Sequence, residues 1–104
     1  MTQPKQFKLT LHAILSVCHN HASGRHIFTG DVYEIYKNCC LTCNIKPLTQ
    51  RRVSDIIAEL DMLGIINAKV ISKGRHGRTR EISLGIPTSN VDQIRSLLRE
   101  SLGL

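Results

Sequence analysis

The sequence predicts an α+β fold that is mostly helical and forms one domain over residues 1–104. Apolar side chains recur at helical spacing between residues 7 and 63, alternate as in β-strands between residues 66 and 86, and return to helical spacing after residue 91. A length of 104 residues corresponds to one typical domain. A hydrophobic content of 41% is too high for a disordered chain, so we expect one modest core.

Two helices are predicted in the first part of the chain. The first spans residues 7–18, and its apolar stripe consists of Phe7, Leu11, Ile14, Leu15 and Cys18. After a break at residues 20–24, a very short strand at residues 26–28 leads to Thr29, a good N-cap residue. The second helix carries a second stripe, made of Val32, Ile35, Tyr36, Cys39 and Cys43.

The third predicted helix has the clearest boundaries. Thr49 is placed to cap its N-terminus, and Leu48 and Val53 flank this cap at the positions of a hydrophobic staple. Gly64 follows the helix at the position that favours glycine. The buried stripe between these ends consists of Val53, Ile56, Ile57, Leu60 and Leu63.

A β-hairpin and a last helix complete the predicted domain. Apolar residues alternate at 66, 68 and 70 and again at 82, 84 and 86, around a basic, glycine-rich tip at residues 73–78. Pro87 ends the second strand, and Ser89 is expected to cap the last helix. The stripe of that helix is Val91, Ile94, Leu97, Leu98 and Leu102.

This order of elements describes a winged helix-turn-helix: three helices, a β-hairpin wing and a C-terminal helix. The linker at residues 44–48 is longer than the tight turn usual between the second and third helices. The net charge is +6, and residues 44–80 hold eight of the 14 basic residues but only three of the eight acidic ones. The excess charge therefore lies on the third helix and the hairpin, the two elements that a winged helix presents to duplex DNA.

The N-terminal turns of the third helix are the part of a recognition helix that reaches base edges. They hold Gln50, Arg51, Arg52 and Ser54. Arginine pairs bidentately with guanine and glutamine with adenine, so these side chains suit base recognition. A solvated helix face whose arginines balance nearby acids is the plainer alternative. An aromatic content of 4% argues against binding single strands by stacking bases.

The hairpin tip carries more charge than a soluble turn needs. Four basic residues and His76 lie within residues 73–80, and two glycines allow a close approach to phosphate. Protonation of His76 at lower pH would add a phosphate contact.

From Leu48 to Ile56 the sequence reads LTQRRVSDI, and from Glu59 to Leu84 it reads ELDMLGIINAKVISKGRHGRTREISL. These segments, together with TGDVYEIY from Thr29 to Tyr36, resemble the C-terminal winged-helix domain of the archaeal origin-recognition and cell-division-control replication initiators. The resemblance covers about residues 8–100.

The resemblance implies that the domain binds duplex repeats at replication origins and then recruits the minichromosome maintenance helicase. It implies recognition-helix contacts from Thr49, Gln50, Arg51, Arg52 and Ser54. It implies wing contacts from Lys73, Gly74, Arg75, Gly77 and Arg78. Members of the family carry an ATPase domain before this one. This chain has no G-x-x-x-x-G-K-[ST] phosphate loop, so it is expected to be an excised domain or a free-standing relative.

A flank rich in cysteine and histidine raises a zinc hypothesis, which would use Cys18, His19, His21, Cys39, Cys40 and Cys43. Reduced core cysteines explain Cys18, Cys39 and Cys43 more simply, because these three fall on the apolar stripes. His12 lies beside the first stripe and is expected on the helix surface. We therefore expect no metal, no cofactor and no enzymatic activity.

The polar N-terminus and the absence of a long apolar run predict a cytoplasmic, nucleoid-associated protein with no membrane contact. As an isolated domain it is expected to be a monomer. Two alternatives remain: a small winged-helix transcriptional regulator, usually a dimer, and a protein-interaction module that docks a replicative helicase.

Overall fold

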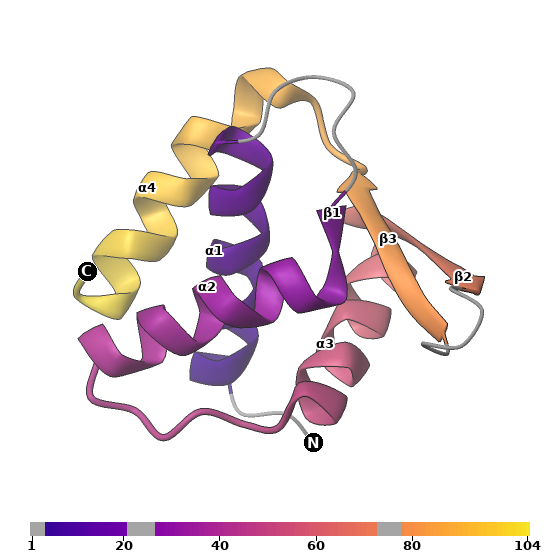
Figure 1. Cartoon of the computed structure of the whole chain (residues 1–104). Coiled ribbons are helices and arrows are strands. Elements are labelled where there is room, and N and C mark those ends of the chain that lie inside the picture. Colours follow the sequence, from indigo (N-terminus) through magenta and orange to yellow (C-terminus); the bar gives the residue numbers. More distant parts are fainter. Residues whose placement is uncertain (1–3, 21–26, 73–77) are drawn as a thin grey trace.

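The computed structural model describes residues 4–20, 27–72 and 78–104. Its elements, in chain order, are α1 (Pro4–Asn20), β1 (Ile27–Phe28), α2 (Thr29–Thr42), α3 (Gln50–Met62), β2 (Ile66–Ser72), β3 (Arg78–Leu84), the short 3₁₀ helix η2 (Thr88–Asn90) and α4 (Val91–Leu102). Figure 1 shows α1 beside the other helices, with the hairpin of β2 and β3 projecting on one side and α4 on the other. This arrangement is the predicted winged helix.

Helix α1 is the centre of the core. Every residue from Leu9 to Leu15 is buried, which covers about two helical turns on all faces. Helices α2, α3 and α4 all pack against α1. The prediction that His12 lies on the helix surface is wrong: the side chain is only 7% exposed, because α2 and α4 cover that face of α1.

The three strands form one antiparallel sheet in the order β1-β3-β2. Ile27 pairs with Ile82, and Ile66 pairs with Leu84 at the base of the hairpin. Ile27, Ile66 and Ile82 are buried, whereas Val70, nearer the tip, is 52% exposed. The base of the hairpin therefore belongs to the core, and its outer part projects from the domain.

The boundaries of α3 confirm the predicted signals. The Thr49 hydroxyl accepts a hydrogen bond from the backbone N–H of Arg52, 3.3 Å away. At the other end, Gly64 has a φ of +80°, in the left-handed region that favours glycine.

Two predicted caps are wrong. Thr29 is the first residue of α2, Phe28 is its N-cap, and the Asp31 carboxylate accepts the Phe28 N–H at 2.9 Å. Ser89 lies inside η2, and α4 begins after Asn90. In both cases the side chain that suits a cap lies next to the true boundary, because strand β1 and the 3₁₀ turn set where each helix begins.

Three stripes also differ from the prediction. In α3, the predicted stripe extends to Leu63, but this residue is the C-cap of the helix and is 64% exposed. In α2, the residue that reaches the core is Cys40, with no exposed surface, while Cys39 and Cys43 are half-buried. In α4, Leu97 is 59% exposed, although it lies beside the buried side of the helix. Within the described residues, no helix has the length and apolar character needed to cross a membrane.

Candidate nucleic-acid interface

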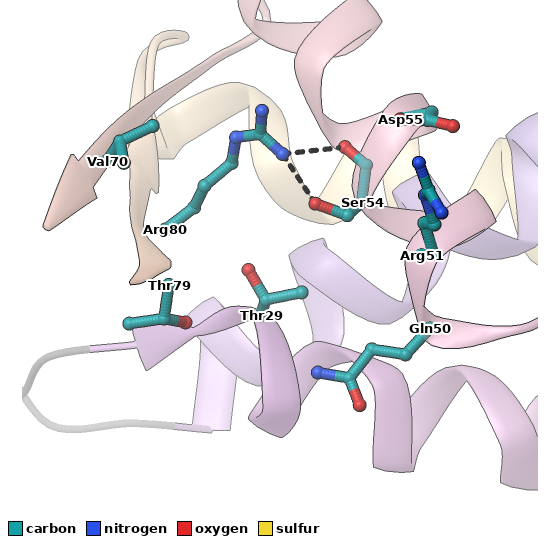
Figure 2. Close-up of a pocket in the computed structure, with 8 residues that line it drawn as sticks. All are labelled: Thr29, Gln50, Arg51, Ser54, Asp55, Val70, Thr79 and Arg80. Carbon is teal, nitrogen blue, oxygen red and sulfur yellow. Dashed lines mark hydrogen bonds between the residues drawn. The ribbon is translucent and has the colours of Figure 1, made fainter. Parts of the chain in front are cut away.

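Helix α3 and the hairpin border a groove of about 600 Å³. Its lining consists of Thr29, Gln50, Arg51, Ser54, Asp55, Val70, Thr79 and Arg80 (Figure 2). Gln50, Arg51, Ser54 and Asp55 come from the first turns of α3, and Val70, Thr79 and Arg80 come from the hairpin strands. The groove thus joins the two elements that the charge distribution of the sequence singled out.

Arg80 connects the two sides of this groove. Its Nη1 donates to the backbone oxygen of Ser54 at 3.1 Å and, more closely, to the Ser54 hydroxyl oxygen (Figure 2). Hydrogen bonds from a charged donor are stronger than neutral ones. The contact therefore holds β3 against α3 and sets the angle between the wing and the recognition helix.

The structure places the predicted recognition-helix residues in different surroundings. Gln50 and Arg51 are exposed and line the groove, so both can reach a ligand there. Arg52 is exposed but is not part of the groove lining. Thr49 caps the helix, and the Ser54 hydroxyl is bound to Arg80.

Most of the predicted wing contacts lie outside the described residues. Lys73, Gly74, Arg75, His76 and Gly77 belong to that part of the chain. Arg78 begins β3, where it pairs with Ser72, so the strands extend as far as residues 72 and 78. The tip between them is one residue shorter than the predicted six-residue segment, because Arg78 belongs to the strand.

Arg80, Val70, Thr79 and Thr29 line the groove without having been predicted as site residues. In the sequence, Arg80 is only one of the basic residues within 73–80. Its direction toward α3 depends on the pairing of β3 with both neighbouring strands, which places residue 80 opposite Val70. No local signal in the sequence marks that side chain as different from Arg75 or Arg78.

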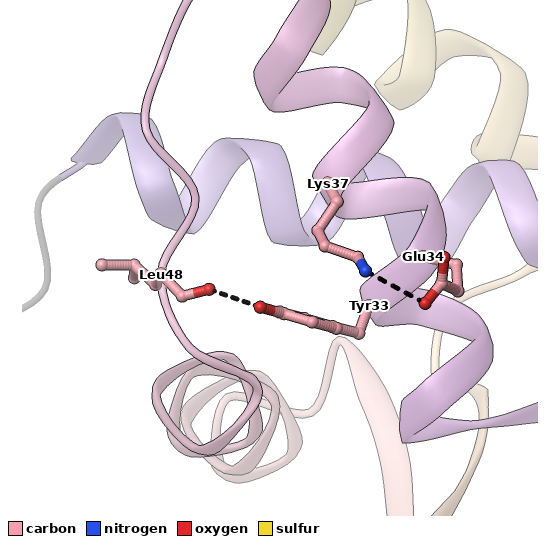
Figure 3. A network of polar contacts seen from close by, with 4 residues as sticks. All are labelled: Tyr33, Glu34, Lys37 and Leu48. Carbon is pink, nitrogen blue, oxygen red and sulfur yellow. Dashed lines mark hydrogen bonds and ion pairs between the residues drawn. The ribbon is translucent and has the colours of Figure 1, made fainter.

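Two tyrosines one turn apart on α2 hold the linker that leads into α3. The Tyr33 hydroxyl donates to the carbonyl oxygen of Leu48 at 2.9 Å (Figure 3). The Leu48 N–H donates to the Tyr36 hydroxyl at 2.8 Å, and that hydroxyl donates in turn to the Gln6 side-chain oxygen. Both polar backbone groups of Leu48 are therefore bound, which positions the start of the recognition helix.

The surroundings of these tyrosines keep the network in one protonation state. Burial raises the pKa of the Tyr36 phenol well above its ordinary value, so the hydroxyl keeps its proton. The Tyr33 ring stacks on Tyr36 with 5.9 Å between centroids, and Lys37 lies 5.1 Å from the Tyr33 centroid. Lys37 also pairs with Glu34 at 3.2 Å (Figure 3). The longer linker is thus anchored by side chains of α2.

The cysteines are free thiols distributed over the core side of α1 and α2. Burial raises the pKa values of Cys18, Cys39 and Cys40, which opposes thiolate formation. Among the side chains that the structure describes, no three or more His, Cys, Asp or Glu gather as a metal site would require. The side chains of His19 and His21, which the zinc hypothesis needs, lie outside that description.

The helices, the hairpin and the basic groove between them define the class of this protein: it is a winged-helix domain. Comparison with known proteins then gives the family. The model of the CDC6 C-terminal winged helix domain matches residues 1–94, and the chain belongs to that family. The resemblance seen in the sequence is thereby confirmed.

The relatives are archaeal proteins named for replication. The chain is 53% identical over 93 residues to an ORC1-type DNA replication protein of Thermococcus onnurineus, covering 89% of this chain and 22% of that protein. It is 52% identical over 93 residues to ORC1-type DNA replication protein 4 of Haloarcula marismortui, covering 89% of this chain and 17% of that protein. The chain therefore spans about a fifth of the length of these relatives.

A solved structure of the Aeropyrum pernix ORC1 protein in complex with DNA has the same fold. It superposes with a TM-score of 0.69 at 39% sequence identity, over 89% of this chain and 27% of that one. The comparison confirms the winged-helix architecture and shows that a relative carrying this domain was solved with DNA bound.

Proposed function

We propose that this domain binds duplex DNA at replication origins, as the sequence-reading winged-helix module of an archaeal-type replication initiator. The observation that carries the proposal is the groove between α3 and the hairpin, where Arg51 and Arg80 face the same space as Gln50. The DNA bound to the Aeropyrum pernix relative supports it. In this proposal the domain binds and positions DNA and has no catalytic role.

The residues of the groove divide into two roles. Arg51 and Gln50 are exposed at the first turn of α3, the part of a recognition helix that meets base edges in the major groove. The wing, with Lys73, Arg75 and Arg78, supplies phosphate contacts, which contribute most of the affinity. Asp55, one turn after Arg51, either accepts from cytosine or orients that arginine. Ser54 supports this surface through its hydrogen bonds with Arg80.

The test is a fluorescence-anisotropy titration of a random-sequence duplex of about 25–30 bp at roughly 50 and 200 mM salt. We expect the logarithm of the affinity to fall with the logarithm of the salt concentration, by about 0.9 per neutralised phosphate. Arg51→Gln should weaken binding severalfold. The control is Lys8→Gln, which also removes one positive charge but lies outside the groove. Lys8 is where α1 meets α4, and its amine donates to the Ser101 hydroxyl at 2.7 Å.

Equal losses in the two variants would mean that only net charge matters and would contradict the assignment of the groove. No binding at low salt would contradict direct DNA contact by this domain.

Selection of bound sequences from a random pool tests whether the domain recognises an origin sequence, because an initiator module should enrich one repeat. If DNA binds without enrichment, the origin-reading role fails while DNA binding stands. Recruitment of the minichromosome maintenance helicase is a further part of the proposal, which a pull-down with purified helicase tests separately.

A further inference from the structure

A second cavity, of about 380 Å³, lies where α1, α2 and α4 meet. In Figure 1, α4 and the C-terminal end of α2 lie on the side of the molecule away from the hairpin, with α1 between them and the sheet. Each helix contributes polar residues one turn apart to the cavity: His12 and Ser16 from α1, Asn38 and Thr42 from α2, and Arg95 and Arg99 from α4. Ile35, Cys39 and Leu104 complete its lining.

The charged side chains of this lining are all positive. Arg95 and Arg99 contribute two guanidinium groups, and none of the nine lining side chains is acidic. Burial lowers the pKa of His12, and the positive charges of Arg95 and Arg99 lower it further. The two guanidinium groups are therefore close enough to act on His12, and their charges would also attract an anion in this cavity.

Two residues that line this cavity each carry a buried nitrogen atom without a hydrogen-bond partner among the described residues. These atoms are Nε2 of His12, whose side chain is 7% exposed, and Nη1 of Arg95. A buried polar atom without a partner is destabilising, so native proteins rarely leave two on the residues around one cavity.

Both of these nitrogens are donors. The Cys39 sulfur lies 3.7 Å from Nδ1 of His12, and burial raises the pKa of that thiol, so it keeps its proton. We therefore assign the S–H as donor to Nδ1, which leaves the proton of the neutral imidazole on Nε2. The guanidinium of Arg95 has only donors. What both atoms lack is an acceptor.

We propose that this cavity is a binding site for a single phosphate-type oxyanion, held by His12, Arg95 and Arg99. Residues with donor groups from two helices line the space, and a tetrahedral anion has enough oxygens to accept from all of them. Arginine matches phosphate oxygens with two parallel hydrogen bonds, which adds to the attraction of opposite charges. The ligand is either free inorganic phosphate or the phosphate of a phosphomonoester.

This site is separate from the proposed DNA surface. None of its lining residues belongs to the groove between α3 and the hairpin. Arg95 and Arg99 follow residue 94, where the match to the family model ends. The inference goes beyond the proposed function and does not depend on it.

The test is titration of the ¹⁵N-labelled chain with inorganic phosphate, and separately with glycerol phosphate, at constant ionic strength set with chloride. NMR signals of the His12 ring and of α4 amides report binding. We expect saturable shifts with a dissociation constant in the millimolar range or tighter, and a rise in the pKa of His12, because a bound anion stabilises the imidazolium. Sulfate, whose charge does not change near neutral pH, is the probe for the pH titrations.

The combined change Arg95→Gln with Arg99→Gln should weaken binding at least tenfold, because it removes both charges while keeping side-chain length. Both arginines are at least partly exposed, so the variant is expected to fold, and amide spectra check this. Arg51→Gln, in the groove of α3, should leave the His12 shifts unchanged. Tighter binding of glycerol phosphate than of inorganic phosphate identifies a phosphomonoester as the ligand, and weaker binding identifies the free ion.

Three results would overturn the proposal. Shifts of His12 that do not saturate, equal binding by the double variant, or saturation by acetate as readily as by phosphate would each show that the cavity does not select an oxyanion of this type.

Discussion

Arg80 in β3 binds both the hydroxyl and the backbone carbonyl of Ser54 in α3, two residues 26 positions apart in the chain. The contact links the wing to the recognition helix at the floor of the groove (Figure 2). It gives Ser54 a structural role, while the DNA contact predicted for Ser54 from its position on the helix stays a prediction.

This contact predicts different effects for its two partners. Arg80→Ala should lower the free energy of unfolding by about 1–3 kcal/mol, because it removes both charge-assisted hydrogen bonds. Ser54→Ala should cost under about 1 kcal/mol, since Arg80 keeps the carbonyl of residue 54 as acceptor. Urea denaturation measures both values. A larger loss for Ser54→Ala than for Arg80→Ala would show that the arginine does not hold the two elements together.

The anchoring of the linker predicts that Tyr36→Phe is more damaging than Tyr33→Phe. Tyr36→Phe removes the acceptor of the Leu48 N–H and the donor to Gln6, so we expect a loss of about 1–3 kcal/mol in unfolding free energy. Tyr33→Phe removes one half-buried bond and keeps the stacking on Tyr36, so its loss should stay under about 1 kcal/mol. Thermal and urea unfolding of the matched pair check this order, which equal losses would contradict.

Gly85 is predicted to resist substitution for steric reasons. A Cβ there would lie 2.5 Å from the carbonyl oxygen of Gly64 and 3.2 Å from the backbone of Ile65. The Gly85 N–H donates to the Ile65 carbonyl at 2.9 Å, and Gly85→Ala must shift the backbone that makes this hydrogen bond. We expect the variant to lose about 1–3 kcal/mol of unfolding free energy.

Gly30→Ala is the matched control for this change. A Cβ on Gly30 meets nothing within 4 Å, and the residue lies in the first turn of α2. Alanine there should be neutral or stabilise the domain by up to about 1 kcal/mol. If both alanine variants unfold at the same urea concentration, the close approach at Gly85 has no energetic effect.

Burial of His12 predicts a loss of stability in mild acid. Its folded pKa lies below the ordinary value of 6.5, so the unfolded chain binds the proton more readily. The contribution of His12 is therefore fully present above about pH 6.5 and is lost as the pH falls through the folded pKa. The measurement is the difference in unfolding free energy between the wild type and His12→Gln, in buffer free of phosphate and sulfate. This difference should shrink as the pH falls from roughly 7.5 to roughly 5. Parallel pH profiles would show that residue 12 does not titrate between the two states.

Local signals were sufficient for the parts of the fold that depend on neighbouring residues. The Thr49 cap, the left-handed Gly64 and the buried stripe of α3 from Val53 to Leu60 each involve positions within one or two turns of each other, and all three are confirmed. Only Leu63, the last predicted member of that stripe, is exposed. The alternation of residues 66–70 and 82–86 likewise predicted the hairpin, because strand period is a local property.

The surroundings of single side chains were less predictable, because they depend on packing between elements. Helix α1 is covered on all faces, so an amphipathic interpretation placed His12 on the surface although it is buried. In α2 the core contacts come from Val32, Tyr36 and Cys40, so Cys40 reaches the core in place of Cys39. Helical periodicity defines which residues share a face, but the neighbouring helices decide which part of that face is covered.

By itself the sequence determined the order of the elements, the boundaries of α3 and the concentration of positive charge on α3 and the hairpin, because all of these depend on residue type and spacing. The tertiary structure alone decided which of these charges face a ligand. Arg51, Gln50 and Arg80 all line the groove, but Arg80 is also bound to Ser54, whereas Arg51 is exposed. It also brought His12, Arg95 and Arg99 together from two helices about 80 residues apart in the chain. Such juxtapositions arise from contacts between distant segments, which no local pattern of residues encodes.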